Sequence, residues 1–210
     1  MDTEYEAGVE MGRFFAEKGI KTAAIYGAFI PNPMHVYRVA GVLSGLGLSY
    51  DGATEEGEVV GKIFTDQSVD LSKISGDIQI VSYLQGYGDT TTDEINAAIQ
   101  AKPEAFISVG MATTFFTQQL NAAGIEFSDI DSFTQSNGEA ITNGKLVYLA
   151  GKYSSSVGPA FALVLNAING NVIRDEQGNA VSLSQNYQVA TDEATFDEFY
   201  KSDNGDNPIY

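Results

Sequence analysis

The stretch 21–46 constrains the fold of this chain more than any other. A short apolar run at 22–26 predicts a buried strand, and the residues after the following turn have the spacing of an amphipathic helix. The intervening Pro-Asn-Pro sequence excludes both a strand ladder and an early helix, so the chain must turn there. Parallel α/β sheets bind ligands where a strand gives way to a helix. We therefore expect Asn32, in the turn, and Arg38, one turn into the helix, to lie beside a binding crevice.

The same succession of strand and helix returns farther along the chain. Strands are predicted at 78–81 and at 105–109, and a helical pattern follows each of them. Further strands are expected at 127–133 and 146–150, around a short helix. Strands that alternate with helices of about 10–15 residues indicate a parallel sheet. The predicted fold class is therefore α/β, a parallel-sheet sandwich.

A helix is expected at the N-terminus, before the first strand. Thr3 and Glu6 form a T-x-x-E capping box, which places the first helical residue at about Glu4. Gly8 and Gly12 lie on the apolar side of this helix, at a cost in helix propensity. We expect these glycines to let the helix approach a sheet closely.

Two regions depart from the regular pattern. Residues 50–75 are rich in Gly, Asp and Glu, and we interpret them as an insertion in the α/β frame, with a short strand at 59–64. After the last strong helix, at 155–170, a strand is predicted at 181–189 and an acidic tail at 190–210.

The helix predicted at 155–170 carries a wide apolar face. Its apolar side chains recur at helical spacing: Val157, Phe161, Val164, Leu165 and Ile168. Each contributes about 1.5–3 kcal/mol when fully buried, so this face is too costly to leave in water and indicates an interface. We expect 153–189 to pack against a second copy of the chain, as a homodimer. The alternative is that this segment folds back onto its own lobe.

Composition excludes several classes of function. The net charge of −17 repels a phosphate backbone, so nucleic-acid binding is not expected. No apolar run is long enough to span a bilayer, and no signal segment opens the sequence as given. The absence of cysteine excludes disulfides, thiolate metal sites and a cysteine nucleophile.

Enzyme signatures are nearly absent as well. The sequence has no G-x-S-x-G elbow, Walker loop, H-E-x-x-H or true G-x-G-x-x-G motif. His35 is the single histidine, and it either lines the cleft or is a solvated loop residue. Asp89 and Asp93 fall at a helix N-terminus, where capping explains them better than acid–base chemistry. We therefore predict no catalysis, no metal and no cofactor.

Three landmarks resemble the type I periplasmic-binding-protein family, which includes ribose- and galactose-binding proteins. The first is the glycine-bearing helix at 2–19, which resembles the helix that leads from the family's first hinge. The second is 38–42, Arg-Val-Ala-Gly-Val, which resembles the family's R-x-x-G-F segment. The third is Lys152 with Gly158 and the helix that ends at 170, which resemble the last crossover between lobes.

The resemblance implies a division of the chain into parts. Residues 1–152 would form the C-terminal-lobe α/β domain, and 153–189 would be a crossover helix and strand that pack on the N-terminal lobe. Family members have an N-terminal lobe of about a hundred residues before the position of Asp2. The chain therefore resembles the C-terminal portion of a longer protein.

The resemblance also assigns ligand-binding positions. The family's sugar-contacting arginine falls on Arg38, and its aromatic residue after the next strand falls on Tyr87. Met111 and Thr134 stand where the family has a polar residue and an aspartate, and Lys152 replaces a hinge glutamine. These departures imply an anionic or zwitterionic solute, or a sugar held differently. We expect Lys152 to lie close to Arg38, where two cations would attract an anion.

The function implied by the resemblance is solute binding for a bacterial ABC importer, in partnership with its permease. The whole protein would be extracytoplasmic, either periplasmic or anchored as a lipoprotein. The alternative is the effector-binding domain of a lactose-repressor-type transcription regulator. An α/β enzyme is the weakest hypothesis, because no nucleophile–base pair can be named.

Overall fold

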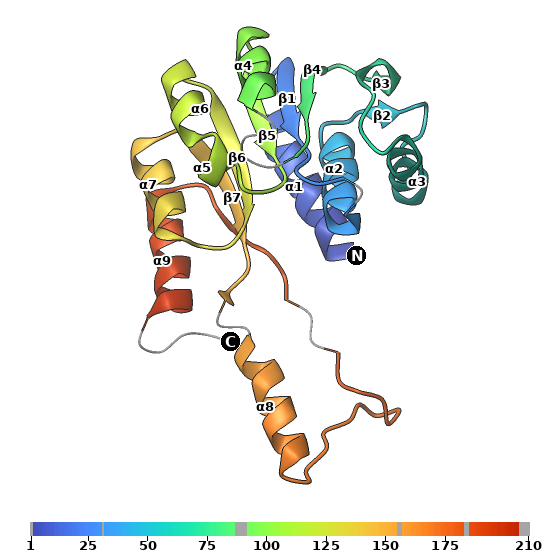
Figure 1. Cartoon of the computed structure of the whole chain (residues 1–210), viewed down its shortest axis with the longest axis vertical. Coiled ribbons are helices and arrows are strands. Elements are labelled where there is room, and N and C mark those ends of the chain that lie inside the picture. Colours follow the sequence, from blue (N-terminus) through green and yellow to red (C-terminus); the bar gives the residue numbers. More distant parts are fainter. Residues whose placement is uncertain (1, 31, 87–91, 155–156, 183–184, 206–210) are drawn as a thin grey trace.

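The computed structural model describes residues 2–30, 32–86, 92–154, 157–182 and 185–205. Its centre is a sheet of six described strands in the order β4-β1-β5-β6-β7-β8 (Figure 1). The first five strands are parallel, and β8 pairs antiparallel with β7. The strands are β1 (Thr22–Tyr26), β4 (Gln79–Leu84), β5 (Ala105–Ser108), β6 (Glu126–Asp131), β7 (Leu146–Gly151) and β8 (Gln188–Ala190). The predicted α/β fold with a mostly parallel sheet is confirmed.

Helices cover both faces of this sheet, and alternate strand residues point into two apolar cores. Ala23 and Ile25 face one core, and Ala24 and Tyr26 face the other. The first core is covered by α1 (Asp2–Glu17) and α2 (Pro33–Gly45). The second is covered by α4 (Thr92–Gln100), α5 (Ala112–Phe115), α6 (Thr117–Ala123), α7 (Gln135–Asn143) and α9 (Glu193–Asn204).

The two helices on the first face cross with their backbones almost in contact. A Cβ atom added to Gly8 would lie 2.2 Å from the carbonyl oxygen of Arg38, and one added to Gly41 would lie 2.1 Å from that of Tyr5. Gly12 is similarly close to the backbone of α2. The prediction that these glycines meet a sheet is therefore wrong, because their partner is a second helix. This crossing fixes α1 against the helix that carries Arg38.

The boundaries of two predicted elements also differ. Because α1 already includes Asp2, Thr3 lies within its first turn and is not the N-cap of a helix that begins at Glu4. The strand expected at 59–64 is wrong, because that stretch lies inside α3 (Glu56–Asp66). A short apolar run such as 59–64 fits a strand and a helix equally well, so its period alone does not decide between the two.

The segment 50–75 contributes no strand to the large sheet in the part that the structure describes. It contains α3, the 3₁₀ helix η1 (Leu71–Lys73) and β3 (Ile74–Ser75). β3 pairs antiparallel with β2 (Ser49–Tyr50) in a separate sheet of two strands. Its interpretation as an insertion relative to the family stays a prediction.

We call residues 153–187 the arm and residues 2–152 and 188–205 the sheet domain. The described stretch 157–182 of the arm extends away from the sheet domain (Figure 1). The arm contains α8 (Val157–Ile168), within the predicted span 155–170, and none of its described residues is buried. The strand predicted at 181–189 is mostly absent from the described residues, and only β8 forms at its end. The described α8 does not fold back onto the sheet.

The region 190–210, for which the sequence indicated only an acidic tail, contains helix α9. Asp192 caps this helix by accepting a hydrogen bond from the backbone N–H of Thr195 at 2.8 Å. On its apolar side Phe196 is buried, and its ring closely approaches Gly138 of α7. Aromatic contacts to Phe133 complete the attachment. The end of the described chain is thus part of the second core.

Candidate functional site

The predicted site residues that the structure describes all follow the carboxyl ends of parallel strands. Asn32 follows β1, Met111 follows β5, Thr134 follows β6 and Lys152 follows β7. These four strands are neighbours in the sheet, so the residues lie along one edge of it. Of the two remaining predicted residues, Arg38 lies in α2, the helix after β1, and Tyr87 lies outside the described residues.

The chain reverses its direction of winding at the centre of this edge. The connection after β1 leads to β4 on one side, and the connection after β5 leads to β6 on the other. In open α/β sheets, ligands bind in the crevice at such a switch point. The edge between the ends of β1 and β5 is therefore the expected binding position.

Arg38 spans this switch point. Its Nη1 donates to the carbonyl oxygen of Val109, directly after β5, at 2.9 Å. Its Nε donates to Glu4 Oε2 at 2.8 Å, and its Nη2 donates to the hydroxyl of Tyr187 at 2.5 Å. The side chain is only 1% exposed. The guanidinium thus lies at the carboxyl ends of the strands and away from bulk solvent, and its contact with a solute stays a prediction.

Lys152 lies beside Arg38, and one carboxylate joins the two. The Nζ of Lys152 donates to Glu4 Oε1 at 2.8 Å and lies 4.2 Å from the ring centroid of Tyr187. We call these four residues, Glu4, Arg38, Lys152 and Tyr187, the Glu4 cluster. The protein's own carboxylate therefore occupies the position between the two cations where an anionic solute was expected.

The charges of the Glu4 cluster determine how Glu4 titrates. Burial alone would raise the pKa of its carboxyl, but the hydrogen bond from Lys152 and the charge of Arg38 outweigh burial. The hydrogen bond that Tyr187 donates at 2.7 Å acts in the same direction. The pKa of Glu4 therefore lies below its ordinary value, and this residue is ionised at neutral pH.

Two other predicted site residues have capping roles in the structure. Asn32 is the N-cap of α2, and its Oδ1 accepts from the backbone N–H of Met34 at 3.0 Å. Thr134 is the N-cap of α7 and forms a reciprocal capping box with Asn137. These contacts explain both residue types without a solute, and a solute contact stays a prediction for both.

Met111 occupies an exposed turn at the end of β5. Its φ of 62° lies in the left-handed region, and its side chain is 38% exposed. The turn is held from below by the buried Asp129 of β6, which accepts hydrogen bonds from the backbone N–H groups of Ala112 and Thr113 at 3.0 and 2.8 Å. Burial raises the pKa of Asp129 even though these bonds oppose the change. Asp129 therefore positions the turn and does not face the crevice.

Sequence reasoning missed several polar groups at this edge. Glu4 was interpreted only as the start of a helix, and Tyr187 only as part of a strand. Gln85, directly after β4, has a buried Oε1 atom without a hydrogen-bond partner among the described residues. Its place at a strand end was the only signal in the sequence.

His35 is not the solvated loop residue that was one of its two expected roles, and its other expected role, lining the cleft, stays a prediction. It is buried, and its Nδ1 accepts from the backbone N–H of Phe29 at 3.0 Å, which fixes the loop after β1. Among the residues that the structure describes, no group of three or more His, Cys, Asp or Glu side chains could hold a metal ion. None of the described helices is long and apolar enough to cross a membrane.

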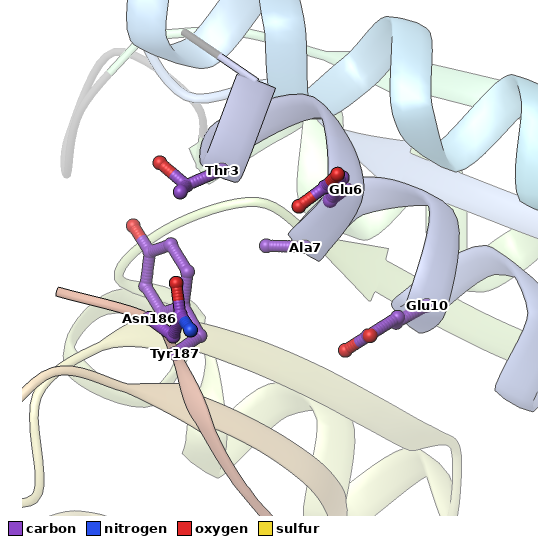
Figure 2. Close-up of a pocket in the computed structure, with 6 residues that line it drawn as sticks. All are labelled: Thr3, Glu6, Ala7, Glu10, Asn186 and Tyr187. Carbon is purple, nitrogen blue, oxygen red and sulfur yellow. The ribbon is translucent and has the colours of Figure 1, made fainter. Parts of the chain in front are cut away.

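A pocket of about 250 Å³ adjoins the Glu4 cluster. Figure 2 shows Asn186 and Tyr187 on one side of it, facing Thr3, Ala7 and the carboxylates of α1 on the other. A second pocket, of about 570 Å³, lies along β3 and β4, and no predicted site residue lines it. No predicted site residue lines the first pocket either, and it borders the Glu4 cluster through Tyr187.

The sheet order defines a doubly wound α/β domain, and polar residues lie at the carboxyl ends of its strands. No protein-family model and no curated protein matches the sequence. Solved structures do match it. One is a periplasmic solute-binding protein of an ABC transporter from Actinobacillus succinogenes 130z with bound D-allose, at 15% identity and a TM-score of 0.61. The match covers 94% of this chain and 61% of that one.

Two further solved structures of periplasmic binding proteins match this chain. The arabinose-transporter binding protein from Shewanella sp. ANA-3 is 16% identical, with a TM-score of 0.60, over 95% of this chain and 60% of that one. The fructose-binding periplasmic domain of a hybrid two-component system is 13% identical, with a TM-score of 0.63, over 93% and 59%. The chain has the fold of a type I periplasmic-binding-protein lobe, as the sequence landmarks predicted. It spans about 60% of the length of these proteins.

Proposed function

We propose that this chain is the C-terminal-lobe portion of an extracytoplasmic solute-binding protein that serves an ABC importer and catalyses no reaction. The observation that carries the proposal is Arg38, held by Val109 at the switch point of the sheet. Similar structures include proteins with bound D-allose, L-arabinofuranose and myo-inositol. Delivery of the solute to an importer's permease, and anchoring as a lipoprotein, are part of the same proposal.

The charge of the site favours a neutral polyhydroxy solute over an anion. Arg38 and Lys152 are both paired with Glu4, so the position between the cations already holds a carboxylate. A second carboxylate there would be repelled by the first, whereas hydroxyl groups both accept from guanidinium and donate to carboxylate. We therefore propose a sugar or another small polyol as the solute.

The regulator alternative receives less support. The similar structures whose names state a role are transport or sensor proteins, among them the allose, arabinose and fructose binders. No observation on the described residues favours an effector domain of a repressor specifically. The importer therefore remains the proposed context.

Solute binding by these 210 residues should be weak. Because the chain spans about 60% of the similar proteins, a second lobe would supply part of the solute contacts. This chain would then make only about half of the contacts to the solute, while the solute loses its full translational and rotational freedom on binding. We expect dissociation constants of about 1 mM or weaker for sugars in calorimetry. Micromolar binding would contradict the proposal that the chain is a half-site.

Saturation-transfer NMR can test the site itself at such affinities. D-allose, L-arabinose and myo-inositol are mixed in turn with the whole chain, with Arg38→Gln and with Arg13→Gln, a control arginine exposed on α1. We expect transfer to at least one of the solutes with the wild-type chain and Arg13→Gln, and at least a tenfold weaker signal with Arg38→Gln. Thermal unfolding confirms that each variant is folded. Equal transfer to the folded Arg38→Gln variant, or none to the wild-type chain, would refute the proposed function.

We also propose that the arm associates with a second copy of this chain. The apolar face of α8 is exposed, and the described helix contains no charged residue, so two such faces can meet without electrostatic repulsion. Light scattering at micromolar concentration should show a dimer, and Phe161→Glu should convert it to a monomer. A wild-type monomer at these concentrations would refute the homodimer.

A further inference from the structure

Arg38 cannot contact a solute in the arrangement that the structure shows. Its side chain is 1% exposed, and among the described residues Glu4, Val109 and Tyr187 accept hydrogen bonds from it. If Arg38 binds the solute, at least one of these partners must move. The three partners differ in how firmly the fold holds them.

Two of the partners are fixed within the sheet domain. Glu4 belongs to α1, which the glycine crossing holds against α2. Val109 continues the ladder of β5, since its N–H donates to the carbonyl oxygen of Tyr26 at 3.0 Å. Moving the Val109 carbonyl would require the sheet to rearrange. Moving the Glu4 carboxylate would also break its ion pair with Lys152.

Tyr187 is the partner that can move. It is the last residue of the arm, in which no described residue is buried. The pocket of about 250 Å³ separates Asn186 and Tyr187 from the outer part of α1, so this stretch is not packed tightly there (Figure 2). Few buried contacts are typical of segments that open locally at low free-energy cost. The ring of Tyr187 is half-buried against the first core, but it borders this pocket, which gives it space into which it can withdraw.

The hydroxyl of Tyr187 has the hydrogen bonds that a solute hydroxyl would have. It accepts from Arg38 Nη2 at 2.5 Å and donates to Glu4 Oε2 at 2.7 Å. An alcohol of a sugar or polyol offers the same combination of one donor and an acceptor oxygen. Replacing the phenol by such an alcohol leaves both charged groups satisfied, which neither an apolar group nor a carboxylate would do.

We propose that Tyr187 is a gate residue whose hydroxyl is the internal ligand of Arg38, and that a solute hydroxyl displaces it. This inference rests on the proposed solute site at Arg38. Lys152 precedes the arm and Tyr187 ends it, so the Glu4 cluster fastens both ends of the arm to α1. Displacement of Tyr187 releases one end while Lys152 still holds the other. Solute binding is thereby coupled to reorientation of the arm.

The hydrogen-exchange rate of the β8 amides reports how firmly Tyr187 is held. β8 follows Tyr187 directly, and its pairing with β7 protects its amides from exchange. Tyr187→Phe keeps the ring but removes the hydroxyl. Hydrogen bonds to charged groups are strong enough that we expect about tenfold faster exchange of β8 in this variant. Tyr200→Phe, on α9, is the matched control and should exchange as the wild-type chain does. Equal β8 exchange in Tyr187→Phe and the wild-type chain would overturn the gate whatever the solute does.

The solute step is tested with myo-inositol, or whichever of the three sugars gives Arg38-dependent saturation transfer. In the wild-type chain the solute should speed β8 exchange, and in Tyr187→Phe it should add little. The same variant should bind the solute about tenfold more tightly, since no internal hydroxyl competes. Arg38-dependent transfer without any change in β8 exchange would overturn the displacement and leave the proposed function intact. No transfer at all would remove the proposed function, and the displacement with it.

Discussion

In the sheet domain, large side chains such as Phe106 and Phe116 are almost completely buried, whereas in the arm Phe161 and Ile168 remain 65% and 76% exposed. The sheet domain places helices over both faces of its sheet, so each apolar side chain of β1 meets a core. The arm has one amphipathic helix and no layer to cover it (Figure 1). Both regions contain large apolar side chains, and they differ in whether other elements cover those side chains.

The two regions differ in what stabilises them. Burial in two cores stabilises the sheet domain without help from the arm. The described arm is attached to the sheet domain at its two ends, through Lys152 and the ring of Tyr153 at one end and through Tyr187 and β8 at the other. Its apolar face requires another surface. The candidate site lies where the two regions meet. A site at such a junction can be altered by movement of the arm while the sheet stays unchanged.

The sharpest test of this comparison replaces one phenylalanine in each region. Phe116→Ala should lower the free energy of unfolding by about 3–5 kcal/mol, because it opens a cavity between β5 and the helices of the second face. Phe161→Ala should change it by no more than about 0.5 kcal/mol, because this ring is exposed. Urea unfolding followed by circular dichroism at low protein concentration measures both. Equal losses would mean that α8 packs against the sheet domain.

The second prediction concerns the helix crossing that holds Glu4 and Arg38 together. Gly41→Ala should destabilise the chain by about 1–3 kcal/mol, because its methyl group would meet the carbonyl oxygen of Tyr5. Gly61→Ala, on the exposed side of α3 where nothing lies within 4 Å, should stabilise it by about 0.5–1 kcal/mol. The same unfolding measurement applies. A harmless Gly41→Ala would show that the two helices can separate without cost.

The smallest expected effect is the acid response of the Glu4 cluster. Because the pKa of Glu4 is lowered in the folded state, its ionic contribution is complete above the ordinary glutamate pKa of about 4.3 and is lost as the pH falls through the lowered value. The protection of the β8 amides, which is their exchange rate relative to the intrinsic rate at the same pH, should therefore decrease in acid. In Glu4→Gln this part of the pH dependence should vanish, and in Glu6→Gln, on the same helix, it should remain. An unchanged profile in Glu4→Gln would show that the carboxylate does not hold the arm.

The strands of the sheet could be predicted because each depends on a local pattern. The run 22–26 coincides with β1, and Arg38 lies at the strand ends as its position in the α2 pattern indicated. The arm's exposed apolar face was also visible in the spacing of Phe161 and its neighbours. These features need only the period of the local sequence.

The remaining features depend on tertiary contacts that no local pattern contains. Glu4 and Tyr187 are separated by 183 residues, so the cluster that covers Arg38 could not be anticipated from either sequence neighbourhood. Gly8 and Gly12 signalled a close approach but not its partner, which is a helix. The acidic composition of α9 concealed Phe196, whose burial depends on α7.

Mapping of backbone amide shifts shows whether a small polyhydroxy solute binds at the carboxyl ends of the strands. The labelled chain is titrated with D-allose, L-arabinose and myo-inositol. We expect saturable changes at the ends of β1 and β5 and around Tyr187, for example at Ala28, Gly110 and Met111. We expect none at the opposite edge, where Lys21, Glu104 and Lys145 precede their strands. Changes concentrated at that opposite edge, or none with any of the three solutes, would contradict solute binding at the carboxyl ends.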